Sequence, residues 1–122
     1  MPYSIGGGGG GGASAEALDH AVYRVLGRVT NITSEDTWQP PLDTTIKSID
    51  CYASTLTGTG DVLMKLFKNN VLLETVTLDS SNKHRIVAVD YQILTTDKLH
   101  WVTELLGEVA CENITGRIKY VL

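Results

Sequence analysis

The chain has 122 residues, 43% of them hydrophobic and 20% charged, which corresponds to one domain. Its 14 acidic residues outnumber 10 basic ones, giving a net charge of −4 with no cluster of Lys or Arg, so binding to nucleic acid is not expected. It lacks both the roughly 20-residue apolar run of a membrane-spanning helix and, in residues 1–5, the features of a signal peptide, so we expect a soluble, unexported protein without membrane contacts.

An uninterrupted run of glycine occupies residues 6–12. Glycine has no side chain to bury and loses the most backbone entropy on ordering, so residues 1–13 are predicted to be an arm outside the folded body. The arm is either a flexible terminus or a segment that becomes ordered in a narrow groove of a neighbouring subunit. In the second case the residues expected to contact the neighbour are Tyr3, Ile5, Gly6, Gly9 and Gly12.

The folded body is expected to cover residues 14–122. At its start, residues 15–21 have the pattern of a short helix, because Ser14 can cap it and apolar residues recur at helical spacing. Over residues 22–30 the period changes to alternation of neighbouring side chains, which predicts a β-strand.

Alternating side chains mark six further strands. These cover residues 45–54, 62–68, 71–78, 84–89, 99–105 and 114–121. Asn69 and Asn70 separate two of them, and asparagine tolerates the positive φ of a type I′ turn, so residues 62–78 are predicted to form a hairpin. Seven strands with short turns between them favour an all-β fold, an antiparallel β-sandwich or jelly roll of about seven or eight strands.

The reactive side chains form no familiar catalytic or metal-binding motif. His20, His84 and His100 lack the spacing that places two metal ligands on one face of a strand or helix. Cys51 and Cys111 are either two buried thiols or, if their strands are neighbours, one disulfide, and we expect free thiols. We therefore predict no enzymatic activity, no metal and no cofactor.

Trp38 lies in a polar loop that is followed by two prolines. Three interpretations are open: the ring covers one end of the sandwich, anchors a contact between subunits, or stacks on a sugar. With Asp36 and Gln39 it forms a second candidate binding site, which would contact either another subunit or a glycan.

The strands and turns of the body follow a familiar order, carried by residues 45–49, 52–53, 58–60, 62–70, 76–78, 97–99 and 114–120. This order resembles that of the small β-sandwich modules of tailed-bacteriophage virions, which serve as capsid decoration (cement) proteins or as tail and fibre modules. The glycine-rich arm is not part of the common pattern.

The resemblance implies a structural virion protein, assembled in the host cytoplasm. As a decoration protein it would form a homotrimer, bind the major capsid protein or another virion protein, and stabilise the shell. The alternative is a tail, fibre or adaptor module that recognises a glycan on the host surface.

Overall fold

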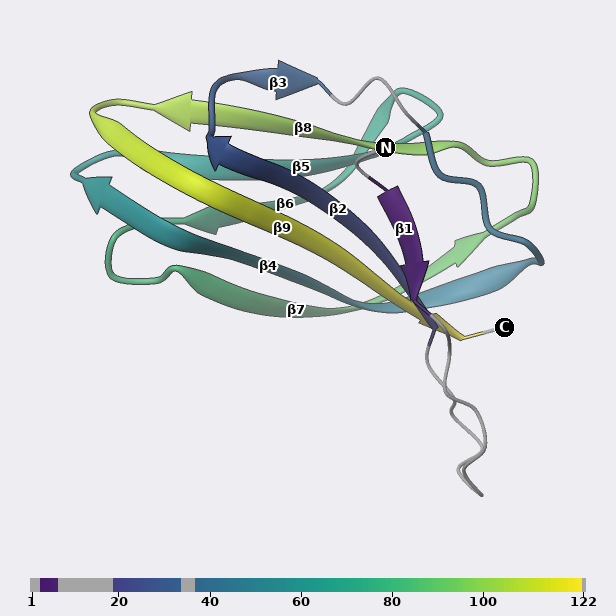
Figure 1. The fold of residues 1–122 in the computed structure, drawn as a ribbon. Helices are drawn as coiled ribbons and strands as arrows, with labels where there is room; N and C mark the ends of the chain where they lie inside the picture. The colour runs from purple at the N-terminus through teal and green to yellow at the C-terminus, as the bar shows by residue number, and fades with distance from the viewer. Residues whose placement is uncertain (1–2, 7–18, 34–36, 122) are drawn as a thin grey trace.

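The structure is a computed structural model and describes residues 3–6, 19–33 and 37–121. In these residues the chain forms nine β-strands, arranged in two antiparallel sheets that make a sandwich (Figure 1). In spatial order, the first sheet contains β1 (Tyr3–Gly6), β2 (Asp19–Arg28), β9 (Val109–Val121), β4 (Thr44–Gly58) and β7 (His84–Ile93). The second sheet contains β3 (Ile32–Thr33), β8 (Leu99–Leu106), β5 (Asp61–Lys68) and β6 (Val71–Leu78). The described part of the chain includes no helix long and apolar enough to span a membrane.

The eight strands β2 to β9 are paired as in a jelly roll. The first of them pairs with the last, β2 with β9, and the following pairs are β3 with β8, β4 with β7, and β5 with β6. Successive pairs alternate between the two sheets, so each sheet receives four strands of this set. The expected all-β antiparallel sandwich is therefore confirmed, and β1 adds one more strand at the edge of the first sheet.

The core lies between the two sheets. On β5 the side chains of Val62, Met64 and Leu66 point inward and are at most 1% exposed, as the alternation predicts. Trp101 of β8 is completely buried among them. Opposite it, Gly116 of β9 leaves room for the indole ring, because a Cβ atom at that position would lie 3.0 Å from the Trp101 side chain.

All seven predicted strands are present in the described residues, and most of them are longer than predicted. The hairpin over residues 62–78 is confirmed. Asn69 and Asn70 have φ angles of 51° and 66°, the positive values that both central residues of a type I′ turn require. Strands β1 and β3 were not predicted.

The helix expected over residues 15–21 is not formed by its last three residues, because residues 19–21 begin β2. Ala21 pairs with Ile118 of β9 and is 1% exposed, so pairing and burial replace a weak local helical preference. Residues 15–18 lie outside the described residues. In the predicted arm, residues 3–6 form β1, whereas residues 1–2 and 7–13 are also outside the described part.

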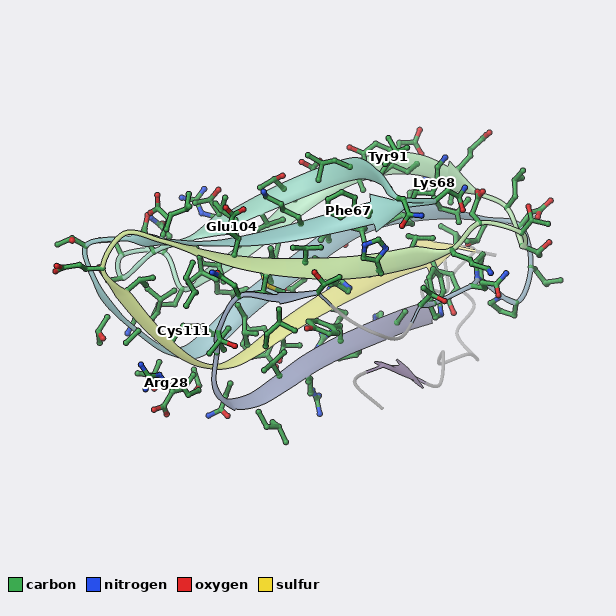
Figure 2. All side chains as sticks on the ribbon, turned by 90° about the horizontal axis from the view of Figure 1, so that it is seen from above. Arg28, Phe67, Lys68, Tyr91, Glu104 and Cys111 are labelled. Carbon is green, nitrogen blue, oxygen red and sulfur yellow. The ribbon has the colours of Figure 1, made fainter. Side chains whose placement is uncertain are left out.

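One end of the sandwich, which we call the turn end, is closed by the turns at residues 59–60 and 107–108. Both N–H groups of the first turn donate to the carbonyl of Glu108, at 2.9 Å each, so the two turns are bonded to one another. Cys111 lies toward this end, and Lys68 lies toward the opposite end (Figure 2).

Candidate functional site

Three loops meet at the end of the sandwich opposite the turn end. We call this region the loop end and define it as residues 37–43, 69–71 and 94–98. Trp38 fixes the first loop through its backbone. The backbone N–H of Trp38 donates to the carbonyl of Leu99 (2.8 Å), and the carbonyl of Trp38 accepts from the backbone N–H of Leu99 (2.9 Å). Because Leu99 begins β8 directly after the third loop, this bridge joins the first loop to the second sheet.

Two side-chain hydrogen bonds connect the first loop to the third. The Nε2 atom of Gln39 donates to the carbonyl of Thr95 (3.1 Å), and the N–H of Thr95 donates to the carboxylate of Asp43 (2.9 Å). Thr95 is therefore held from both sides by residues that are far from it in sequence.

The carboxylate of Asp97 connects the third loop to the hairpin turn. It accepts hydrogen bonds from the N–H of Leu94 (2.8 Å) and from the side-chain amide of Asn69 (2.7 Å). The Asn69 oxygen in turn accepts from the N–H of Lys98 (3.0 Å). The Leu94 N–H, followed by the Asn69 amide, holds the pKa of Asp97 below its ordinary value, so the carboxylate is ionised at neutral pH and keeps these bonds.

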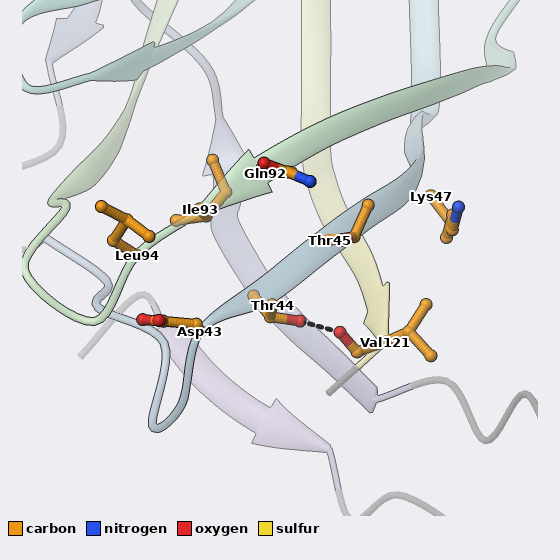
Figure 3. Close-up of a pocket in the computed structure, with 8 residues that line it drawn as sticks. All are labelled: Asp43, Thr44, Thr45, Lys47, Gln92, Ile93, Leu94 and Val121. Atoms are coloured by element: carbon orange, nitrogen blue, oxygen red, sulfur yellow. Dashed lines mark hydrogen bonds between the residues drawn. The ribbon is translucent and has the colours of Figure 1, made fainter.

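A groove of about 470 Å³ lies beside the loop end (Figure 3). It forms where β4 begins and where β7 and β9 end, because the register places Thr45 between Gln92 and Val121. The hydroxyl of Thr44 donates to the carbonyl of Val121 on one side of the groove (Figure 3). The lining residues are Asp43, Thr44, Thr45, Lys47, Gln92, Ile93, Leu94 and Val121.

The groove can bind a small polar molecule. Its volume lies in the range of ligand pockets, and it offers hydroxyl, amide, ammonium and carboxylate groups as hydrogen-bonding partners. The Nζ atom of Lys47 lies 3.0 Å from Oδ1 of Asp90, and both side chains are well exposed. Because an exposed ion pair of this kind is weak, the ammonium group of Lys47 can bind a ligand instead.

Apolar side chains project from the same end of the molecule. Leu42 is 58% exposed in the first loop, Leu94 is 52% exposed in the third loop, and Val71, which begins β6 directly after the hairpin turn, is 68% exposed. Leu94 also lines the groove. These three exposed side chains make the loop end a candidate surface for contact with another molecule, since apolar residues gathered in one region mark such surfaces.

Trp38 is not a surface residue. Its side chain is 4% exposed, and its ring lies 5.0 Å from the ring of Tyr120, centroid to centroid. The ring covers the end of the core, as in the first of the three interpretations, and in this structure it has no face free for a sugar or a second subunit. Of the residues grouped with it, Gln39 is exposed at the loop end and Asp36 lies outside the described residues.

The candidate residues of the arm are partly described. Tyr3, Ile5 and Gly6 belong to β1, which pairs with β2 of the same chain. Gly9 and Gly12 lie outside the described residues. Contact of these residues with a neighbouring subunit stays a prediction.

The two cysteines are free and buried, and they do not meet. On the paired strands β4 and β9, Cys51 faces Gly116 whereas Cys111 faces Leu56. The two sites are five residues apart along β9 (116 − 111 = 5), or about 17 Å at 3.4 Å per residue, which is beyond the reach of a disulfide. Burial raises the pKa of both thiols, that of Cys111 to about 11.

One buried carboxylate lies outside the loop end. Asp50 of β4 is 5% exposed, and its Oδ1 atom is 2.6 Å from Nε2 of His84 on β7. The ring of Tyr52 packs edge-on against the same imidazole at 5.7 Å. Within the described residues, no group of three His, Cys, Asp or Glu side chains is arranged to hold a metal ion. This pair joins β4 to β7.

The sequence analysis did not select the groove or the contacts that order the loop end. Thr45 and Gln92 are distant in sequence, and only the β4–β7 register brings them together. Asp97 had a local signal that could have revealed it, since an Asp that bonds the N–H three residues before it is a common turn feature.

The chain matches no family model and no curated protein. The class that the fold and the site define is a small jelly-roll domain with a polar groove beside a hydrogen-bonded loop surface that exposes apolar side chains.

Proposed function

We propose that this protein is a structural virion protein, a bacteriophage capsid decoration (cement) subunit that binds the capsid surface as a homotrimer and stabilises the shell. The order of strands and turns in residues 45–122 supports this role, and so does the jelly-roll connectivity, which is common in viral capsid domains. Because one fold serves many functions, the surface features carry more weight than the fold.

The loop end is the observation that carries the proposal. It presents Leu42 and Leu94 on loops whose positions are fixed by hydrogen bonds, together with Val71 at the start of β6. A surface that is ordered before binding loses little conformational entropy when it binds, and its exposed apolar area supplies the favourable free energy. Repeated over a shell, even a weak contact of this kind reinforces the lattice.

The proposed partners are the major capsid protein or another virion protein, bound at the loop end, and further copies of this chain. The N-terminal arm would contact a neighbouring copy. A matching partner surface would combine an apolar patch, for Leu42 and Leu94, with hydrogen-bonding groups that reach the groove.

The copy number in intact particles tests this role directly. Mass spectrometry and cryo-electron microscopy of purified particles should find the protein in many copies, arranged on the capsid lattice. Its absence from particles, or fewer than about ten copies per particle, would contradict a decoration role, because multivalent reinforcement needs many sites.

A pair of variants tests the surface. Leu94→Asp should weaken attachment to particles by about tenfold or more, because it places a charge in an apolar contact. Leu26→Asp is the matched control: Leu26 is 80% exposed but lies on β2, outside the loop end. Equal attachment of the two variants would show that the loop end is not the contact surface.

A second candidate function is recognition of a host-surface glycan by a tail, fibre or adaptor module. The polar lining of the groove favours it, since Gln92, Lys47 and Thr45 offer the hydrogen-bonding groups that a sugar needs. Binding on a glycan array that is lost in Gln92→Ala and kept in Leu26→Ala would support this function. No binding by the wild-type protein would exclude it for the glycans on the array.

A further inference from the structure

Strand β1 joins its sheet through pairing with β2. It is the outermost strand of its sheet, and its antiparallel register matches Tyr3 with Tyr23, Ser4 with Val22, and Ile5 with Ala21. On its other side β2 pairs with β9. The bonding edge of β2 over residues 20–23 is therefore the docking site for β1.

The chain between the two strands consists of residues 7–18, and it begins with six glycines, residues 7–12. A glycine-rich segment of this length has a typical end-to-end distance of about 20 Å, and at full extension it spans about 40 Å. The second value is of the order of a small domain's diameter, so residues 3–6 of one copy can reach the β2 edge of an adjacent copy.

Pairing within a chain and pairing between chains use the same contacts. The backbone hydrogen bonds and the register are identical in both cases, so the two states differ mainly in the entropy of the connecting segment. An intramolecular strand acts at an effective concentration on the order of millimolar. Neighbouring copies held side by side in an assembly reach comparable local concentrations, and exchange between them then has little free-energy cost.

From this geometry we infer that β1 is an exchange strand: in an assembly it leaves the β2 edge of its own chain and pairs, in the same antiparallel register, with β2 of a second copy. The inference rests on the proposed function for its setting, an array of adjacent copies, and it identifies the partner and the site of the arm. Each copy then gives its β1 to one neighbour and can accept a β1 on its own β2, so the arm links adjacent copies.

The register supplies a test with single cysteines. One preparation carries Ser4→Cys, and a second, uniformly labelled with ¹⁵N, carries Val22→Cys. Directly opposed residues of an antiparallel pair have Cα atoms about 4.5–5.5 Å apart, which suits a disulfide. Val22 is 8% exposed and lies outside the core cluster, whereas Cys51 and Cys111 are at most 1% exposed, so a cysteine at position 22 is more accessible than either native thiol.

The two preparations are mixed at millimolar concentration and oxidised, and intact mass spectrometry then measures the masses of the disulfide-linked dimers. A mixed disulfide between one labelled and one unlabelled chain forms in high yield only if β1 of one copy pairs with β2 of the other, because random collisions favour no register. The matched control replaces Val22→Cys with Arg24→Cys, which is on the same strand but two residues out of register. We expect at least about tenfold more mixed disulfide with Val22→Cys than with Arg24→Cys.

Equal yields for the two positions, or no mixed disulfide at millimolar concentration, would overturn strand exchange. A single chain with both Ser4→Cys and Val22→Cys shows that the variants fold, because it should form an internal disulfide in dilute solution. Exchange in solution by a protein that is absent from particles would contradict only the proposed function. A protein abundant on particles whose double variant forms disulfides only within each chain would contradict only the exchange.

Discussion

The side-chain amide of Asn69 lies 2.7 Å from the carboxylate of Asp97, and this contact joins the β5–β6 hairpin turn to the loop that precedes β8. The same carboxylate accepts the N–H of Leu94, so one side chain positions two loops. The exposed Leu94 owes its orientation to this arrangement. The order of the loop end therefore depends on these polar contacts as well as on the packing of Trp38 in the core.

Replacement of Asp97 by alanine should destabilise the protein by about 1–3 kcal/mol, because it leaves the N–H of Leu94 and the amide of Asn69 without their charged acceptor. Urea denaturation measures the change. Asp90→Ala is the control: it removes a carboxylate from an exposed ion pair with Lys47 and should cost less than about 1 kcal/mol. An equal decrease in unfolding free energy in the two variants would contradict a stabilising role for the Asp97 hydrogen bonds.

The stabilisation by Asp97 should depend on pH. Its pKa is lower in the folded protein than in the unfolded chain, because the Leu94 N–H and the Asn69 amide favour the ionised form. The contribution is therefore complete above the unfolded pKa and is lost as the pH falls through the folded pKa. The difference in unfolding free energy between wild type and Asp97→Ala should be largest at neutral pH and shrink as the pH falls below the ordinary aspartate pKa of about 3.9. A difference that stays constant would contradict this assignment.

Both cysteines should be unreactive in the native protein. Cys51 and Cys111 are at most 1% exposed, and burial raises the pKa of each thiol, so little thiolate forms at neutral pH. Ellman's reagent should detect almost no thiol in native buffer and two thiols per chain in denaturant. Fewer than two in denaturant, without reductant, would reveal the disulfide that the register does not allow.

The turn end should not tolerate a side chain at Gly60. A Cβ atom there would overlap the carbonyl oxygen of Leu106, which is backbone and cannot move aside, so Gly60→Ala should cost more than about 2 kcal/mol. Gly27→Ala is the matched control. Gly27 has a φ of +78° but nothing within 4 Å of its Cβ position, so only conformational strain of about 1 kcal/mol is expected. Thermal unfolding measures the loss of stability in each variant, and the melting temperature of Gly60→Ala should fall further than that of Gly27→Ala.

Trp38 should contribute strongly to stability although it was selected as a candidate surface residue. Trp38→Ala empties the space against Tyr120 and should cost about 3–5 kcal/mol, whereas Trp38→Phe keeps a ring there and should cost less. Its exposed neighbour gives the control, since Gln39→Ala removes one exposed hydrogen bond and should cost less than about 1 kcal/mol. A loss of less than 1 kcal/mol in Trp38→Ala would place the ring outside the core.

The sequence by itself determined most of the strands of this fold, because their signals are local. Alternation of period two marked the strands, as at Val62, Met64 and Leu66, since successive side chains of a strand point to opposite faces. Asn69 and Asn70 marked the hairpin, since the turn needs positive φ at both residues. The local helical pattern of residues 15–21 failed where β2 begins, because pairing with β9 buries Ala21.

Only the tertiary structure decided what is buried and what is brought together. The sequence left three interpretations of Trp38 open, and the tertiary structure, through the bridge to Leu99, places the ring against Tyr120 in the core. The groove depends on the register of three strands, and the loop end depends on contacts such as that of Asn69 with Asp97. The physical reason is the same in each case: these positions are set by pairing between distant strands, which no local pattern encodes.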